Sequence, residues 1–400
     1  MNIREITDGI LYAGVNDRVT DRFEALWPLP YGVSYNSYIV RGTEKTALID
    51  TVEIGTLPDY LGQVREAIGD ADVDYIVVNH MEPDHSGALP FMLEVYPQAR
   101  IVGNRQTLGM VKGFYHVADD RLLEVADGAT LPLGGKTLRF FLTPMVHWPE
   151  TMMTYVEEDL VLFSGDAFGT FGALNGGVVD AEMDTAWYRD EMYRYYSNIV
   201  GKYGRFVEKA LAKLAGIDIN FICSTHGPVW HDHIDEVIEI YGKLARYESE
   251  PGVTIIYGSM YGNTAEVAEE IGRQLSARGV RNIRIHNASH DNMSDMISDA
   301  FRYEGLIVGA PTYSMHIFPP VEQFMIAMET REVKNKVTAT FGSFTWASGA
   351  AAKINEYLAA MKAEPVYTMT MKQSIDSSVK EEIARLAEAV VGNLKVTPHS

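Results

Sequence analysis

Short apolar runs separated by glycine-rich or polar turns dominate residues 1–247. The runs expected to form strands are 9–15, 35–40, 46–52, 75–79, 100–103, 137–142, 152–156, 160–164 and 221–224. Amphipathic segments predict helices over 57–68, 105–115, 184–215 and 233–247. This mixed order indicates stacked sheets flanked by helices.

The pattern becomes regular after a polar Pro-Gly break at 248–252, which is typical of a linker. Apolar runs at 253–257, 283–286, 305–309, 336–341 and 365–370 then alternate with amphipathic segments. Five such units predict a doubly wound, five-stranded parallel sheet. We therefore expect an α/β protein with two domains, 1–249 and 252–400.

Composition restricts the class of protein. The 400 residues carry a formal net charge of −20, which argues against nucleic-acid binding because phosphate attraction needs a basic surface. The single cysteine, Cys223, excludes an intramolecular disulfide and a thiolate metal cage, and its apolar setting favours an inert core residue. The N-terminus has no apolar signal core and no run is long enough to span a membrane. We expect a soluble, cytoplasmic protein.

The run from His80 to His85 is the strongest chemical signal in the chain. Four of its six residues can bind a metal, and they follow an apolar run expected to be a buried strand. Three later candidates, each after another strand-like run, are expected to meet them on one rim of a sheet. The complete candidate set is His80, Glu82, Asp84, His85, His147, Asp166 and His226. Its mixture of imidazoles and carboxylates suits two metals that share a carboxylate and keep open positions.

Other histidines lack ligand spacing and are interpreted as structural; these are His116, His231, His233, His286, His290 and His316. Taken alone, Asp166 is also compatible with a turn residue or a helix N-cap. The ordered six-residue motif is what favours a metal site over these structural alternatives.

The metal motif resembles that of the metallo-β-lactamase superfamily, His-x-His-x-Asp-His, with Glu82 in place of the second histidine. This substitution is similar to the pattern of flavodiiron proteins. The resemblance implies an αββα sandwich in which one iron takes His80, Glu82 and His147. It assigns Asp84, His85 and His226 to the other iron and makes Asp166 the bridge. Hard carboxylate oxygens with imidazoles also favour ferrous iron over zinc.

The second half has a candidate phosphate site where strand-like 253–257 runs into 258–264 and a helix begins. Hydroxyl groups and free N–H groups at a helix N-terminus bind anions. This segment resembles the phosphate loop of flavodoxins, and two later loops stand where flavodoxins bind the flavin ring, with Tyr313 and Trp346 expected to flank it. The resemblance implies FMN held by Ser259, Met260, Tyr261, Gly262, Asn263, Thr264, Pro311, Thr312, Tyr313, Ser314, Ser343, Phe344, Thr345, Trp346 and Gly349. The alternative is a set of ordinary loops with core aromatic residues.

The sequence departs from the family near the expected irons. Some members have histidine in an early Phe-His-Gly segment, whereas this chain has Phe23-Glu24-Ala25. Glu24 is expected to shape the substrate pocket or relay protons. Tyr195 and Tyr196 match a tyrosine pair in the family, and one of them is expected to reach the pocket while helix packing explains the other.

The two halves together resemble the minimal two-domain flavodiiron form, because the chain stops at His399-Ser400 without a rubredoxin-like or flavin-reductase extension. This resemblance implies reduction of oxygen to water or of nitric oxide to nitrous oxide, protecting the cell against these gases. Electrons would arrive through FMN from a rubredoxin or a reduced deazaflavin. It also implies a head-to-tail homodimer or a dimer of dimers. The rival interpretations are a zinc hydrolase and an electron carrier with a degenerate metal domain.

Overall fold

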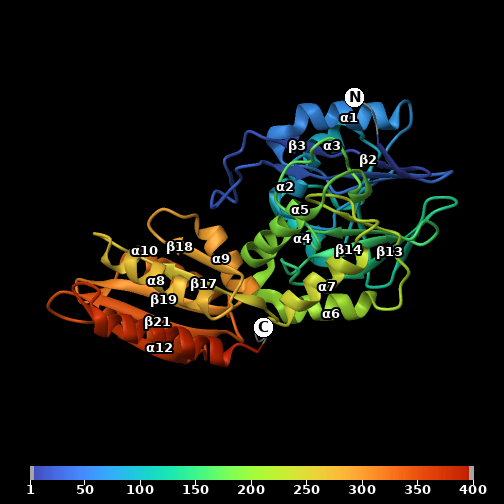
Figure 1. Ribbon diagram of the computed structural model, residues 1–400. Coiled ribbons are helices and arrows are strands. Elements are labelled where there is room, and N and C mark those ends of the chain that lie inside the picture. Colours follow the sequence, from blue (N-terminus) through green and yellow to red (C-terminus); the bar gives the residue numbers. More distant parts are fainter. Residues whose placement is uncertain (1–3, 396–400) are drawn as a thin grey trace. The chain divides into compact units, whose positions relative to one another are not determined.

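The computed structural model describes residues 4–395, so the chain end at His399-Ser400 lies outside the described part. The chain divides into two compact units between Gly242 and Lys243, and Figure 1 shows their elements. The expected domain limits, 1–249 and 252–400, remain a proposal. Over residues 4–395, no helix is long and apolar enough to cross a membrane.

The first unit contains two main sheets. The seven-stranded sheet has the order β1-β2-β7-β8-β9-β10-β11. Its strands are β1 (Arg4–Thr7), β2 (Ile10–Tyr12), β7 (Tyr38–Arg41), β8 (Thr46–Ile49), β9 (Tyr75–Val77), β10 (Arg100–Gly103) and β11 (Leu122–Glu124). The five-stranded sheet runs β12 (Thr130–Pro132), β13 (Thr137–Leu142), β14 (Met152–Val156), β15 (Val161–Gly165) and β16 (Phe221–Ser224). Short pairs join β3 (Val15–Asp17) to β6 (Val33–Tyr35) and β4 (Arg22–Phe23) to β5 (Trp27–Pro28).

Helices cover the outer sides of these sheets, with α1 on one side and α6 and α7 on the other (Figure 1). The helices are α1 (Leu57–Ile68), α2 (Pro83–Ser86), α3 (Leu89–Val95), α4 (Arg105–Tyr115), α5 (Ala186–Tyr195), α6 (Gly204–Leu214) and α7 (Ile234–Ala245). The strands β14 and β15 are buried along their whole length, as expected for strands covered on both faces. This layered arrangement is the expected αββα sandwich.

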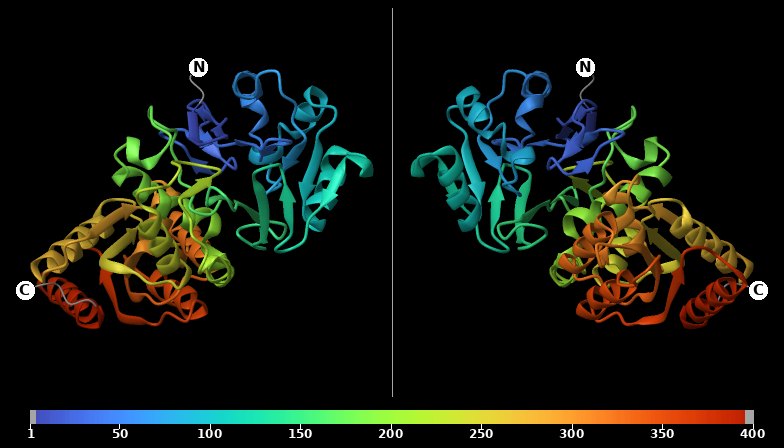
Figure 2. Two further views of the ribbon diagram at one scale, coloured as in Figure 1. Left: turned by 90° about the vertical axis from the view of Figure 1, so that its right-hand side faces the viewer. Right: turned by 90° about the vertical axis from the view of Figure 1, so that its left-hand side faces the viewer.

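The second unit is a doubly wound sheet of order β18-β17-β19-β21-β22 with every neighbouring pair parallel. Its strands are β17 (Glu250–Tyr257), β18 (Ile283–Asn287), β19 (Tyr303–Tyr313), β20 (His316–Ile317), β21 (Val337–Phe344) and β22 (Pro365–Lys372). Its helices are α8 (Asn263–Ala277), α9 (Met293–Arg302), α10 (Pro319–Thr330), α11 (Ala350–Ala360) and α12 (Ser377–Asn393). Helix α8 packs with α12, whereas α10 packs with α9 and α11, so both faces of the sheet are covered (Figure 2).

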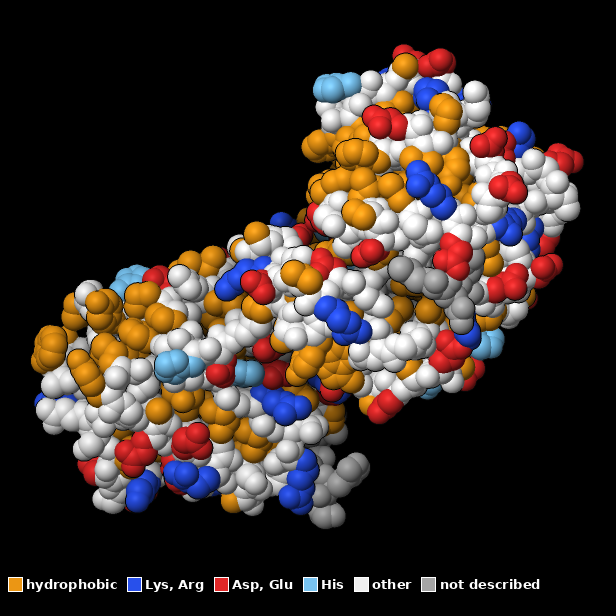
Figure 3. Space-filling model, turned by 90° about the horizontal axis from the view of Figure 1, so that it is seen from above, with side chains coloured by type: hydrophobic (Ala, Val, Ile, Leu, Met, Phe, Trp, Pro, Cys, Tyr) orange, Lys and Arg blue, Asp and Glu red, His pale blue; other side chains and the backbone are white. Residues whose placement is uncertain are grey.

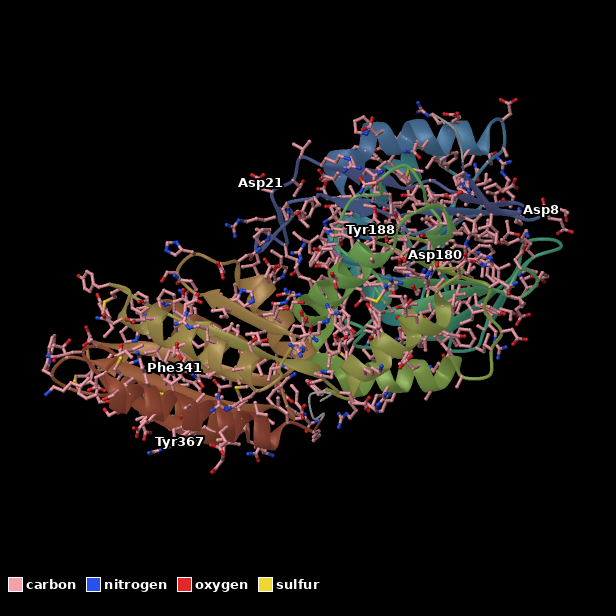
Figure 4. All side chains as sticks on the ribbon, viewed as in Figure 1. Asp8, Asp21, Asp180, Tyr188, Phe341 and Tyr367 are labelled. Atoms are coloured by element: carbon pink, nitrogen blue, oxygen red, sulfur yellow. The ribbon has the colours of Figure 1, made fainter. Side chains whose placement is uncertain are left out.

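One hydrophobic core of this unit forms between the sheet and the pair α8 and α12. Phe341 of β21 is 1% exposed, while Tyr367 of β22 lies near the outer edge of the sheet (Figure 4). Gly309 lies beside Phe341 on the neighbouring strand, and a Cβ atom at Gly309 would clash with that ring. Close packing here therefore requires a glycine in β19.

Several expected elements differ from the structure. The strands expected over 9–15 and 35–40 are each interrupted, and the helix expected over 184–215 changes to a π-helical turn at Tyr196–Val200 and a 3-10 turn before α6. The linker expected at 248–252 is wrong, because Pro251 and Gly252 belong to β17, where the pairing with β19 shifts register. The five-stranded prediction omitted β20, a two-residue strand antiparallel to β19.

Candidate functional site: a buried metal centre and a cofactor cavity

The seven candidate ligands come from connections that follow strands of the first unit. His80 and Glu82 follow β9, α2 carries Asp84 and His85, and His147 lies between β13 and β14. Asp166 follows β15, and His226 follows β16. Each of the seven residues is at most 9% exposed. The fold therefore brings seven buried imidazoles and carboxylates together from distant parts of the sequence.

One group consists of His80, Glu82 and His147. Oε2 of Glu82 lies 3.2 Å from Nε2 of His80 and 3.0 Å from Nε2 of His147. The two Nε2 atoms are 3.4 Å apart. Each of these side chains offers a ligand atom within 4.8 Å of the others, together with Asp166, which is the spacing that a single metal ion needs.

The second group consists of Asp84, His85 and His226. Oδ2 of Asp84 lies 3.2 Å from Nε2 of His85 and 3.2 Å from Nε2 of His226. Within the described chain, both carboxylate oxygens of Asp84 and Nε2 of His226 are buried without a hydrogen bond. Buried polar atoms are almost always satisfied, so these atoms indicate a bound species that completes the group.

Asp166 lies between the two groups and presents one oxygen to each. Its Oδ2 atom is 3.2 Å from Nε2 of His147 and 3.4 Å from Nε2 of His80. Its Oδ1 atom is 2.9 Å from Nε2 of His85. A carboxylate in this position can bind one metal through each oxygen, so the donor set fits a dinuclear centre.

Electrostatics support the same fit. Burial alone would lower the pKa of His147, but its hydrogen bonds with Asp166 and Glu82 outweigh burial and raise the pKa to about 9. Burial would likewise raise the pKa of Asp166, but His85 and His80 hold it well below the usual range. Three carboxylates so close together in a buried site require positive charge, and metal ions supply that charge when they displace the histidine protons.

Neighbouring groups that the sequence did not reveal orient the ligands. Oε1 of Glu150 lies 2.8 Å from Nδ1 of His80 and also accepts a hydrogen bond from the backbone N–H of Met81. The Thr225 hydroxyl donates to Oδ1 of Asp166 at 2.6 Å, and Nδ1 of His226 lies 2.8 Å from the carbonyl oxygen of Ser34. Such contacts fix the tautomer and direction of metal-binding side chains. The only sequence signal for Glu150 is that it is a carboxylate three residues after His147.

A cavity of about 500 Å³ adjoins the metal ligands. It is lined by Thr20, Arg22, Phe23, Glu24, Tyr35, Glu53, Glu82, Pro83 and Asp84. Burial and the neighbouring Glu82 carboxylate raise the pKa of Glu24 to about 7. Glu82 and Asp84, one from each group of ligands, thus face a space that a small molecule can enter.

The two tyrosines of the sequence pair lie in different surroundings. The ring of Tyr195 lies 5.4 Å from that of His226, and its buried hydroxyl has no hydrogen-bond partner among the described residues. The ring of Tyr196 instead packs edge-on against Tyr241 at 5.0 Å. Tyr195 is therefore the member of the pair beside a metal ligand.

A second cavity, of about 450 Å³, lies in the other unit at the carboxyl ends of β17, β19 and β21. Of the expected FMN residues, those that line it are Ser259, Met260, Tyr261, Asn263, Thr264, Pro311, Thr312, Ser314, Ser343, Phe344, Thr345 and Trp346. The cavity has hydroxyl groups near the N-terminus of α8 and aromatic side chains such as Trp346. This combination fits a ligand with a phosphate and a flat ring.

Three expected FMN residues do not line this cavity. The ring of Tyr313 packs against Phe318 at 6.0 Å, and the Gly349 N–H donates to the Thr312 hydroxyl. Gly262 precedes α8 with φ of +96°, a conformation that favours glycine, and its N–H donates to the Ser259 hydroxyl. The sequence missed Met315, Ala347 and Gln373, which do line the cavity.

Comparison with known proteins agrees with this architecture. Residues 33–227 match the ODP family beta lactamase, and residues 255–385 match flavodoxin. The chain is 34% identical to an anaerobic nitric oxide reductase flavorubredoxin of Escherichia coli, over 82% of this chain and 69% of that protein. It is 32% identical to an uncharacterized protein of Methanocaldococcus jannaschii, over 88% of both chains.

The structure also resembles rubredoxin oxygen:oxidoreductase from Desulfovibrio gigas. The TM-score is 0.92 at 28% identity, covering 97% of this chain and 98% of that one. The chain therefore belongs to the flavodiiron protein family. It is an oxidoreductase with a β-lactamase-like domain and a flavodoxin-like domain, and its cofactors are FMN and a non-haem diiron centre.

Proposed function

We propose that the protein reduces oxygen to water, nitric oxide to nitrous oxide, or both, with electrons that reach the irons through FMN. The observation that carries this proposal is the pair of ligand groups on either side of Asp166, with Glu82 and Asp84 facing one cavity. In this assignment, one iron takes His80, Glu82 and His147, and the other takes Asp84, His85 and His226, with Asp166 as the bridge. Two metals with adjacent open positions suit a diatomic molecule.

The residues of the chain prepare the site in three ways. Glu150 and the carbonyl oxygen of Ser34 hold His80 and His226 in the tautomers whose Nε2 atoms face the metals. Phe23 and Phe171 pack around Tyr195 and limit the access of water to its hydroxyl. Burial raises the pKa of Tyr195 well above its usual value, so its hydroxyl stays protonated beside the His226 ring. When bound, the irons supply the electrons for gas reduction and the flavin supplies those electrons to the irons.

The cofactor cavity supports electron delivery from outside the chain. Four residues that line it carry exposed apolar side chains: Met260, Tyr261, Met315 and Trp346, the last two being 57% and 88% exposed. Hydrophobic side chains gather at one end of this unit in Figure 3. Exposed apolar groups of this kind suit contact with another protein. We therefore infer a head-to-tail homodimer or a dimer of dimers, and a rubredoxin or a reduced deazaflavin as the donor.

In this proposal the protein acts in the cytoplasm and removes oxygen or nitric oxide that would harm other enzymes. The test is to load the protein with iron and FMN, reduce it without oxygen, and measure consumption of each gas separately. We expect at least one gas to be consumed and its product, water or nitrous oxide, to appear in proportion to the electrons supplied. Consumption of neither gas would contradict the proposal, and ester cleavage by the zinc-loaded protein would favour a hydrolase.

A further inference from the structure

The hairpin that joins β19 to β20 carries two residues in a left-handed conformation. Tyr313 pairs with His316 across the hairpin, so Ser314 and Met315 form its turn. Their φ angles are +50° and +64°. A two-residue turn with positive φ at both positions favours Asn or Gly, and a bulky side chain in this conformation costs energy. The backbone of the turn therefore gives no reason for a methionine at position 315.

Neighbouring backbone groups hold this strained turn in place. The Thr312 hydroxyl accepts hydrogen bonds from the backbone N–H groups of Gly349 at 3.0 Å and Ala350 at 3.2 Å. A Cβ atom at Gly349 would lie 2.8 Å from the carbonyl oxygen of Met315, so the hairpin packs closely against the start of α11. These contacts fix the hairpin relative to the loop that carries Trp346.

The Met315 side chain lines the cofactor cavity, whereas that of Tyr313 does not. Met315 is 57% exposed and contributes to the wall of the 450 Å³ cavity. The ring of Tyr313 packs against Phe318 at 6.0 Å. A side chain that remains largely exposed adds little to the stability of the fold. A strained turn kept beside a cavity instead indicates a use in binding.

The cavity offers different chemistry to the two ends of a flavin nucleotide. The hydroxyl groups of Ser259 and Thr264 lie near the N-terminus of α8 and suit the phosphate. Met315 and Trp346 instead offer a thioether and an indole ring, both of which contact aromatic rings favourably. We propose that Met315 is, together with Trp346, a contact residue of the flavin ring, in the role that the sequence assigned to Tyr313. This inference requires FMN in the cavity but does not require reduction of either gas.

The test compares Met315→Gly with a matched control, Lys362→Gly, in the whole FMN-free chain. Glycine at position 315 suits the left-handed turn and removes the thioether. Lys362 is an exposed residue of the same unit that also has a positive φ, +57°, and lies outside the cavity. Fluorescence titration with FMN and with riboflavin, which has the same ring but no phosphate, gives two affinities for each variant. Urea unfolding without ligand compares their stabilities.

We expect Met315→Gly to weaken the binding of FMN and of riboflavin by the same factor, about tenfold, because the loss concerns the ring that both ligands share. Without ligand, this variant should unfold at the same urea concentration as the wild type or at a higher one, since glycine relieves the strained turn. Met315→Leu should keep most of the affinity, and Lys362→Gly should keep all of it.

Unchanged flavin affinity in Met315→Gly would overturn the inference, as would a loss for FMN alone, which would assign Met315 to the phosphate. A larger loss in Tyr313→Leu than in Met315→Gly would also overturn it, by returning the ring contact to Tyr313. If Met315→Gly does not fold, Met315→Asn provides the same test with the same expected loss, because asparagine also tolerates positive φ.

Neither measurement involves iron or gas reduction, so the two proposals can fail separately. If the loaded wild-type protein consumes neither gas but Met315→Gly binds both flavins more weakly, the role of Met315 stands and the proposed function is wrong. If the wild-type protein reduces a gas and Met315→Gly binds both flavins normally, only the role of Met315 is wrong.

Discussion

The metal site and the cofactor cavity are built in opposite ways. The seven proposed metal ligands are buried residues, and neighbours such as Glu150 and Thr225 hold their side chains. The cofactor cavity is formed by three loops after parallel strands, and it exposes side chains such as Tyr261 at 92% and Trp346 at 88%. A site for small cations needs charges fixed within a few tenths of an ångström, whereas a site for a large planar ligand needs an open surface and backbone donors.

This difference predicts how each site responds to a single substitution. In the metal site, loss of one charge disturbs every neighbour, because the carboxylates and histidines are coupled in a buried environment. In the cofactor cavity, many weaker contacts together bind the ligand. Loss of one hydroxyl group should therefore reduce the affinity for FMN only by a limited factor.

The largest effect is expected from Asp166→Asn, because Asp166 contacts both ligand groups. Asparagine lacks the negative charge and offers only one oxygen, so we expect loss of bound iron and a fall in gas reduction of more than about a hundredfold. FMN should remain bound. Iron and FMN content per chain and the rate of gas consumption are the measurements.

The matched control for this variant is Asp180→Asn. Asp180, labelled in Figure 4, is a buried carboxylate of the same unit that accepts backbone hydrogen bonds from His231, Asp232 and His233. It belongs to neither group of candidate metal ligands. Retention of iron in Asp180→Asn would show that the loss is specific to the bridging position. Full gas reduction by Asp166→Asn would instead support an electron carrier.

A smaller effect is expected from Glu150→Gln, which weakens the orientation of His80 without removing a ligand. Loss of a carboxylate that holds a metal-binding histidine should lower iron affinity about ten- to a hundredfold. Chelator competition measures this change, with Glu157→Gln as the control because the Glu157 carboxylate is exposed. Equal affinities for wild type and Glu150→Gln would show that packing alone holds His80.

The sequence predicts features that depend on neighbouring residues better than features that depend on long-range contacts. Strands 100–103, 137–142 and 152–156 match their expected bounds, because each is an apolar run ended by polar or glycine residues. The expected strand 35–40 is interrupted after Tyr35, where the Asn36 side chain turns inward to donate to the carbonyl oxygens of Ser224 and Gly227. That contact joins residues far apart in sequence, so no local pattern reveals it.

The site follows the same rule. The His80–His85 motif is local, so the sequence predicts it. Glu150 is buried beside His80 only because two connections that are distant in sequence meet at one rim of the sheets. In the second unit, the hydroxyl groups and the helix that follows them predicted the phosphate loop. The sequence did not predict that Gln373 lines the cavity, because this depends on how β22 ends beside β21.

For the cofactor cavity, Thr264→Val should weaken FMN binding by about tenfold while leaving iron binding unchanged. The Thr264 hydroxyl lies 2.8 Å from the Ser343 hydroxyl in the cavity wall, and a hydrogen bond to a charged phosphate contributes about 1.5–3 kcal/mol. Fluorescence titration of the FMN-free protein measures the change. Thr254→Val is the control, because it removes a buried hydroxyl of β17 that donates to the carbonyl oxygen of Asp299. A similar loss in both variants would indicate general destabilisation.

The smallest effect concerns His286, which lies between two carboxylates as the metal-binding histidines do. Its Nε2 atom is 2.8 Å from Asp299 and its Nδ1 atom is 3.2 Å from Asp291. Burial alone would lower the pKa of His286, but the hydrogen bond to Asp299 outweighs burial and raises the pKa above 6.5. The charged ring therefore stabilises the fold fully below about pH 6.5, and this contribution disappears as the pH rises through the raised value.

His286→Gln should consequently lower the free energy of unfolding by about 1 kcal/mol at pH 6 and by much less at pH 9. Urea unfolding of both proteins at the two pH values measures the difference, and the exposed His290 provides the control His290→Gln. An equal loss at both pH values would mean that His286 acts by packing. The expected result would show that the charged His286 ring forms ion pairs with Asp291 and Asp299.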